Sequence, residues 1–182
     1  MEMTGSVKAF VLHWGEMGTR WGVNRTVAQV HALLYLSPEP LTAEEIAETL
    51  GVARSNVSTS LRELQGWHLA TAAHEIGDRR VHFHTSHDVW TLFLTVIEQR
   101  VEREIVPTML MLRRCAAEAR AERPVRAEVT GRIAAMEAYL TEIHGWYQEI
   151  KKLPPATLRA LLQSGTAITR MLPASRRRSA TR

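Results

Sequence analysis

The sequence has little cysteine and no long apolar run. Its 182 residues include one cysteine, Cys115, so a disulfide framework and a cysteine-based zinc finger are excluded and a reducing cytosol is expected. No stretch of about 18 apolar residues occurs, which excludes a spanning helix. Charged side chains interrupt the N-terminal region where a secretion signal would need an apolar core. We therefore expect a cytoplasmic protein with no membrane partner.

The motifs that accompany common enzymes are also missing. The sequence has no glycine-rich phosphate loop, no nucleophile elbow and no His-Glu-x-x-His zinc motif, and Cys115 has no histidine partner nearby in sequence. We therefore predict no enzymatic activity, no cofactor and no metal. A cluster of histidines leaves a pH or metal sensor as an alternative, although polar residues on a solvated surface explain it more simply. This cluster holds five of the eight histidines: His68, His74, His82, His84 and His87.

Positive charge is concentrated at the C-terminus. The net charge is +4, but residues 173–182 hold four arginines and no acid. Without them Lys and Arg number 23 − 4 = 19, against 19 acids, so the body of the chain is neutral. The high isoelectric point is thus no argument for a nucleic-acid-binding surface. The tail Arg176–Arg178 either adds salt-sensitive affinity for phosphates or serves only as a solubilising end.

Glycines and prolines divide the first half of the chain into short elements. Asn24 predicts an N-cap, and the Thr42-Ala43-Glu44-Glu45 run predicts a capping box. Two extended runs around a Gly-Asp turn predict a β-hairpin, the only β-structure expected. The predicted helices are residues 2–17, 24 to about 37, 42–50 and 54–65, and the predicted strands are residues 69–73 and 81–85.

The second half of the chain is predicted to be helical. One pattern runs from residue 88 to 120 and contains Pro107, which should kink or split the helix. A heptad pattern follows, then a last helix over residues 156–171 and a disordered tail. The fold class is mainly α. The predicted domains are a winged helix-turn-helix over residues 1–87, a helical dimerisation and effector region over 88–172, and a basic tail over 173–182.

The order of capped short helix, glycine turn, helix and hairpin is that of a winged helix-turn-helix. The second helix keeps one polar side free for the major groove of double-stranded DNA, and no acid occurs from residue 54 through 62. A helical hairpin with a small polar outer face is the alternative. The hairpin tip adds Arg79 and Arg80, placed to reach the flanking DNA backbone or minor groove. The free side of the helix comprises Arg54, Ser55, Asn56, Ser58, Thr59 and Arg62.

Two stretches resemble the GbsR branch of the MarR-type transcriptional regulators. These stretches are WGVNRTVAQVHALLYLSPEPLTAEEIAETLGVARSNVSTSLRELQGWHLA and GDRRVHFHTSHDVWTLF, and the resemblance covers roughly residues 7–115. It implies a dimeric winged-helix regulator, either a repressor, which we favour, or an activator. It also implies that Asp78 orients Arg80 toward the minor groove. Asn24 and Ala53 depart from the family pattern, and the lost cap at Ala53 costs about 1 kcal/mol.

A heptad seam predicts where a homodimer would form. Two modules on a two-fold axis would read a palindromic operator. Packing within one chain, against the preceding long helix, is the alternative use of the seam, and the helix at residues 2–17 is a second dimerisation candidate. The seam comprises Val129, Ile133, Met136, Leu140, Ile143, Tyr147 and Ile150, spaced 4, 3, 4, 3, 4 and 3 residues apart.

An effector and a rival function complete these predictions. The GbsR branch that the sequence resembles includes regulators that respond to choline, a cation that an aromatic cage would bind. Trp90 and Phe93 lie next to the wing and are our candidates for a small-molecule effector site, although buried tryptophan more commonly belongs to a core. The rival function is a protein-interaction module, in which the heptad helix binds a partner and the winged helix binds no specific DNA. The neutral body charge favours this alternative.

Overall fold

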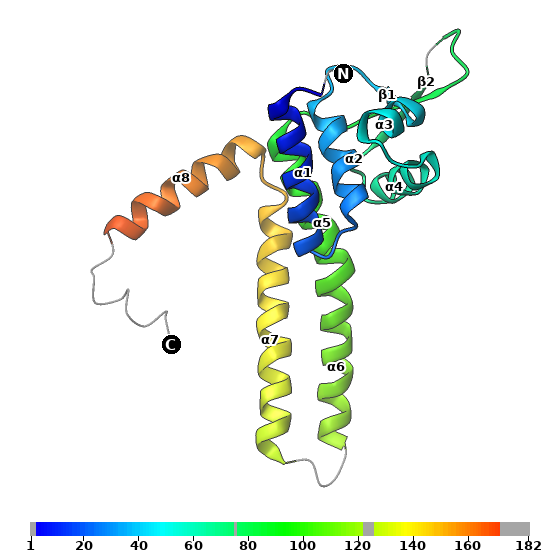
Figure 1. Cartoon of the computed structure of the whole chain (residues 1–182). Coiled ribbons are helices and arrows are strands. Elements are labelled where there is room, and N and C mark those ends of the chain that lie inside the picture. The colour runs from blue at the N-terminus through cyan, green and yellow to red at the C-terminus, as the bar shows by residue number, and fades with distance from the viewer. Residues whose placement is uncertain (1–2, 75, 122–125, 172–182) are drawn as a thin grey trace. The chain divides into compact units, whose positions relative to one another are not determined.

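The computed structural model describes residues 3–74, 76–121 and 126–171. The chain divides into two compact units, Met1–Gln99 and Arg100–Arg182. The elements of the first unit (Figure 1) are α1 (Gly5–Arg20), α2 (Arg25–Leu36), β1 (Leu41–Thr42), α3 (Ala43–Leu50), α4 (Arg54–Gly66), β2 (Thr71–His74), β3 (Val81–His84) and α5 (Val89–Arg100). The elements of the second unit are the π-helical turn η1 (Val101–Ile105), α6 (Val106–Ala121), α7 (Ala127–Ile150) and α8 (Pro155–Met171).

The boundary between the units lies later than the one predicted between residues 87 and 88. Leu92 and Val96 of α5 pack against the buried core of the first unit. Their burial ties most of α5 to the winged helix, so this unit continues to Gln99.

Local capping signals set the order of the short helices. The Asn24 side chain accepts a hydrogen bond from the amide of Thr26 at 2.8 Å and caps α2. Thr42 and Glu45 form the predicted capping box of α3, and Gly51 ends that helix with φ of +64°. These contacts lie within a few residues of one another, which explains why the sequence predicts them.

α1 differs from its prediction at both ends. It was expected over residues 2–17, with Gly18 at a break, but it runs from Gly5 to Arg20. Thr4 caps its start, and Gly18 is buried inside the helix. A Cβ atom on Gly18 would lie 2.5 Å from the Cβ atom of Ala28. Gly18 therefore permits a close approach of α1 and α2 rather than ending the helix.

The described strands form one three-stranded antiparallel sheet in the order β1-β3-β2. The predicted hairpin of β2 and β3 is confirmed, with Thr71 opposite His84. The expectation that this hairpin is the only β-structure was wrong, because Leu41 and Thr42 pair with Phe83 and His82. A two-residue strand is too short to show an alternating pattern, so only the folded partner reveals it.

A continuous apolar core lies beneath the sheet and between α2, α3 and α4. It positions α4 by burying one side of that helix and leaving the other in solvent. Its members are Val27, Val30, Leu33, Leu34, Leu41, Ile46, Val57, Leu61, Leu64, Leu69 and Ala70.

The second unit contains a helical hairpin. α6 and α7 lie side by side (Figure 1), and Arg113 Nε lies 3.1 Å from Glu137 Oε1 across them. The predicted division of the long helix near Pro107 is confirmed, since η1 interrupts it just before that residue. No helix in the described ranges is long and apolar enough to cross a membrane. The predicted disordered tail, residues 173–182, falls outside the described residues.

Candidate nucleic-acid interface

The polar side of α4 faces solvent as predicted. Val57, Ser60, Leu61 and Leu64 are buried, which fixes the rotation of the helix about its axis. The opposite side presents hydroxyl, amide and guanidinium groups. Of the six residues predicted to face DNA, five are exposed (Arg54, Ser55, Asn56, Thr59 and Arg62) and Ser58 is half-buried.

The two arginines of α4 already have partners within the protein. Arg62 donates from Nε to the carbonyl oxygen of Ser58 at 3.4 Å and from Nη2 to Thr59 Oγ1 at 3.3 Å. Arg54 Nη2 lies 2.5 Å from Glu44 Oε1. Glu44 stands in the first turn of α3, so this ion pair joins the two helices of the helix-turn-helix at their N-terminal ends.

α4 begins without a side-chain cap. Ala53 precedes the helix in an extended conformation and has no side-chain acceptor for the free amides of the first turn. Those amides and the helix dipole leave partial positive charge at this end, which favours an anion such as a DNA phosphate.

Asp78 and Arg80 form an ion pair with several hydrogen bonds in the loop between β2 and β3. Arg80 Nε donates to Asp78 Oδ1 and Oδ2 at 3.1 and 3.0 Å, and Arg80 Nη2 donates to Oδ2 at 2.6 Å. The Arg80 amide adds a bond to Oδ1 at 2.8 Å. Hydrogen bonds from the side chain and then the backbone of Arg80 lower the pKa of Asp78 to about 2. The carboxylate therefore stays charged and holds the guanidinium in one orientation at neutral pH.

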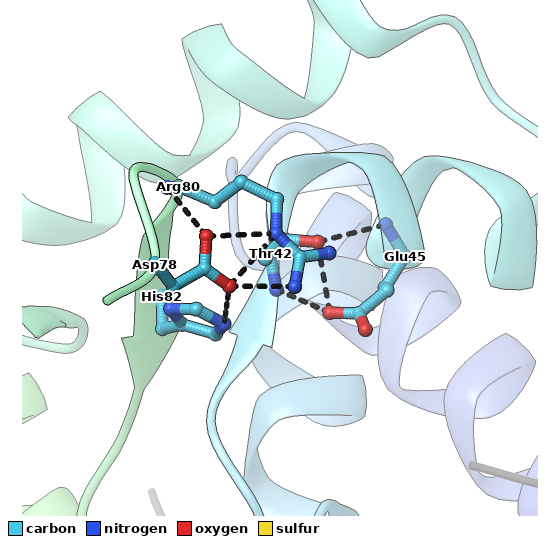
Figure 2. Close-up of polar contacts among 5 residues, drawn as sticks. All are labelled: Thr42, Glu45, Asp78, Arg80 and His82. Atoms are coloured by element: carbon cyan, nitrogen blue, oxygen red, sulfur yellow. Dashed lines mark hydrogen bonds and ion pairs between the residues drawn. The ribbon is translucent and has the colours of Figure 1, made fainter. Parts of the chain in front are cut away.

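The Arg80 side chain lies back toward α3 rather than extending from the loop. Figure 2 shows it over the Asp78 carboxylate and near the capping box of Thr42 and Glu45. Its pKa is raised chiefly by the hydrogen bond to Asp78, and the charges of Glu45 and Glu44 add to the effect. The pKa of Glu45 is lowered, first by the hydrogen bond from the Thr42 backbone. The positive charge of Arg80 is thus balanced by carboxylates, chiefly that of Asp78.

The other residues predicted at the wing differ in exposure. Arg79 is exposed beside Gly77, whose φ of +90° makes the turn. His82 is buried on β3, and its Nε2 lies 3.8 Å from Asp78 Oδ2 (Figure 2). Among the described residues, no three His, Cys, Asp or Glu side chains are grouped so that they could hold a metal ion.

The acidic side of this surface is not visible along α4 alone. No acid occurs between residues 54 and 62, but Glu44 reaches Arg54 from α3. The capping-box motif predicts a helix start but not the pairing of Thr42 with His82 in the sheet. That pairing joins β3 of the wing to the residue that caps α3. Because the two residues lie 40 positions apart, no local sequence signal could have indicated the pairing.

The heptad seam is divided between two environments on α7. Ile133, Leu140, Tyr147 and Ile150 are half-buried, whereas Val129, Met136 and Ile143 are exposed. Tyr139 and Trp146, which the seam did not include, are exposed by 60% and 65% and continue the stripe of Met136 and Ile143. The exposed stripe of α7 is Val129, Met136, Tyr139, Ile143 and Trp146, spaced 7, 3, 4 and 3 residues apart.

The two candidate effector residues contact each other. The rings of Trp90 and Phe93 meet edge to face with centroids 6.4 Å apart, and Phe93 is 53% exposed. Both lie in the part of α5 that belongs to the first unit.

The geometry of α3, α4 and the three-stranded sheet defines a winged helix-turn-helix. Residues 21–81 match the model of the MarR family, and the elements, mainly helical with a small three-stranded sheet and C-terminal helices, match a MarR winged-helix fold. A crystal structure of a transcriptional regulator is similar, with a TM-score of 0.64, 19% identity, and coverage of 80% of this chain and 95% of that one.

The chain also matches two further proteins. The "Putative HTH-type transcriptional regulator YvaV" of Bacillus subtilis (strain 168) is 23% identical over 91 residues, 50% of this chain. The aligned region spans about half of that relative, 51% of its length. The S. aureus MepR–DNA complex has a TM-score of 0.36 and 17% identity, with 79% of this chain and 98% of that one covered.

Proposed function

We propose that the protein is a DNA-binding transcriptional regulator of the GbsR branch of the MarR family, acting as a homodimeric repressor on a palindromic operator. The observation that carries this proposal is the exposed, acid-free side of α4 beside a wing whose arginine is fixed by Asp78. Both features are parts of one compact unit. They match what a duplex requires, a helix for the major groove and a cation for the adjacent backbone or minor groove.

The side chains of α4 suit base readout. Asn56 carries the donor and acceptor that pair with the edge of adenine, and Ser55 and Thr59 are small enough to allow a close approach. Arg62 has five N–H donors, of which Nε and one on Nη2 point back to α4 itself. Arg62 is exposed, and the remaining donors of its guanidinium would reach a phosphate or a guanine.

The exposed stripe of α7 is the proposed dimer surface. Five large apolar side chains at heptad spacing stand in solvent along one helix of the second unit. Stripes of this kind bury against an identical stripe in two-stranded helical interfaces, and a two-fold axis makes the contact self-complementary. The half-buried members of the seam belong instead to the packing within the chain. In this proposal the exposed and half-buried members of the seam take the two roles that the sequence left open.

A small cationic effector is a subsidiary part of the proposal. Trp90 and Phe93 offer two perpendicular rings, an arrangement that a quaternary ammonium group would contact. Choline titration followed by tryptophan fluorescence tests it. No change at millimolar choline would remove choline as the ligand.

The test of DNA binding is a salt series with the Arg80→Ala variant. A duplex selected by the wild-type protein from a random pool should bind about tenfold more weakly to the variant, with a salt dependence reduced by about one phosphate contact. Arg20→Ala, at the exposed end of α1, is the matched control and should bind as the wild type does. Unchanged affinity of Arg80→Ala would refute the wing assignment.

Selection of a duplex from the random pool also tests the rival function, a protein-interaction module. A protein-interaction module would select no sequence from the pool, and its residual binding would not distinguish one duplex from another. Enrichment of a two-fold symmetric sequence would support the regulator and its dimer together.

A further inference from the structure

The N-terminal turn of α3 places an acid beside the first arginine of the proposed DNA surface. Glu44 Oε1 lies 2.5 Å from Arg54 Nη2 and also contributes to the electrostatic environment of Arg80. Arg54 is the first residue of α4, where side chains of a recognition helix contact base edges or phosphates. One acid therefore pairs with the first arginine of α4 and also acts on the charge of the wing arginine.

The ion pair is accessible to solvent rather than buried. The side chains are 67% exposed for Arg54 and 44% exposed for Glu44. An exposed pair contributes little to the stability of the fold, because water and salt screen it. Glu44 is also not needed for the capping box, which Thr42 and Glu45 complete on their own. Stability of the monomer thus gives a weak reason for an acid at this position.

The position is costly for DNA binding without a compensating role. The start of a helix attracts phosphate through its free amides, and Glu44 puts a negative charge at that point in α3. Any duplex docked on α4 would bring further phosphates close to this carboxylate. The charge penalty applies to every sequence, whereas a base contact by a correctly oriented Arg54 is gained only on the right one.

We propose that Glu44 is a positioning residue that sets DNA specificity: it holds Arg54 for a base contact through the ion pair between α3 and α4, while its charge lowers the affinity for every duplex. The pair leaves the other N–H groups of Arg54 available, because the contact runs through Nη2 and Oε1. A held guanidinium loses less rotamer freedom when it meets a base edge. A released guanidinium would instead follow any phosphate within reach. This inference rests on the proposed function of the winged helix.

The test compares Glu44→Gln with the wild-type protein on two duplexes. One duplex is selected by the wild-type protein from a random pool, and the other is a random-sequence duplex of equal length. Glu44→Gln should bind the random-sequence duplex about fivefold more tightly at low salt, with a logarithmic salt slope steeper by about 0.9. Binding of the selected duplex should change little, so the ratio of the two affinities should fall by up to about fivefold.

Two control variants separate this role from a general charge effect. Glu48→Gln removes an exposed acid from the same helix, farther from its N-terminus, and should leave the affinity ratio unchanged. In the Arg54→Gln background, Glu44→Gln should no longer change the ratio, because there is no guanidinium to hold. A thermal unfolding curve for each variant verifies that the fold is intact.

The outcomes distinguish the two proposals. If the wild-type protein selects no sequence, the proposed function fails. If it selects one and Glu44→Gln keeps the wild-type ratio of affinities, only the role of Glu44 is refuted. An equal shift in Glu48→Gln would likewise refute it, since net charge alone would then explain the effect.

Discussion

His31 should make the stability of the protein depend on pH in the range between neutral and mildly acidic. It lies on α2 with 7% of its surface exposed, and its Nε2 is 3.5 Å from Thr85 Oγ1. Burial removes the water that would solvate an imidazolium, which lowers the pKa of His31 from 6.5 to about 4. The folded protein therefore keeps this ring neutral at pH values where an unfolded chain protonates it.

The sign and size of the effect follow from that difference. Above about pH 6.5 the ring is neutral in both states, and its full contribution to stability is present. As the pH falls from about 6.5 to about 4, only the unfolded state gains the proton, so the free energy of unfolding decreases. The total loss is about 3 kcal/mol, of which about 2.5 kcal/mol falls between pH 7.5 and pH 4.5. Below about pH 4 both states are protonated, and His31 causes no further loss.

Urea unfolding at fixed protein concentration measures this loss, because dimerisation would otherwise shift the apparent stability. His31→Gln keeps a polar group near Thr85 but has no proton to gain, so its stability should fall less than that of the wild type between pH 7.5 and 4.5. The difference should be about 2.5 kcal/mol. His84→Gln, exposed on β3, is the matched control and should follow the wild type. A proton NMR titration in which the His31 ring titrates near pH 6.5 in the folded protein would refute the reasoning.

Two further predictions concern packing. Gly18→Ala should destabilise the protein by about 1–3 kcal/mol, because its Cβ would lie 2.5 Å from that of Ala28. Adding Ala28→Gly should restore part of the lost stability in the same urea assay. No loss in the single variant would mean that α1 and α2 do not approach closely. Ile143→Glu should convert the dimer to monomer in light scattering after size exclusion, because it places a charge in the exposed stripe of α7, whereas Ala138→Glu, exposed on another side of that helix, should leave the dimer intact. A dimer that survives Ile143→Glu would place the interface elsewhere.

The features predicted correctly from sequence depend on contacts between residues close together along the chain. The caps at Asn24 and Thr42 involve partners two and three residues away. The orientation of α4 follows from the spacing of Val57, Leu61 and Leu64 on one side of a helix. Each of these signals involves only residues within a few positions of one another, so it can be read from the sequence without knowing the tertiary structure.

The features that were missed depend on contacts between distant segments. The strand at Leu41 and Thr42 exists because β3 lies beside it, about 40 residues further along the chain. The length of α1 depends on how closely α2 approaches Gly18. The pairing of Arg54 with Glu44 requires α3 and α4 to turn back on each other. In each case a tertiary contact overrides or adds to the local preference.

The charge arrangement of the winged helix also explains how a neutral body could bind DNA selectively. Net charge governs long-range attraction, but a duplex docked on α4 senses the charges near that helix. There the cations Arg54 and Arg80 each have a carboxylate partner, Glu44 and Asp78. Because Arg54 and Arg80 are already paired, they gain little from phosphates alone, so the nonspecific affinity of the surface should be low. Discrimination must then come from contacts to base edges, made by the uncharged side chains of α4 and by the Arg54 guanidinium that Glu44 holds, and satisfied only by the correct base pairs. Strong nonspecific binding by the wild-type protein at physiological salt would contradict this account.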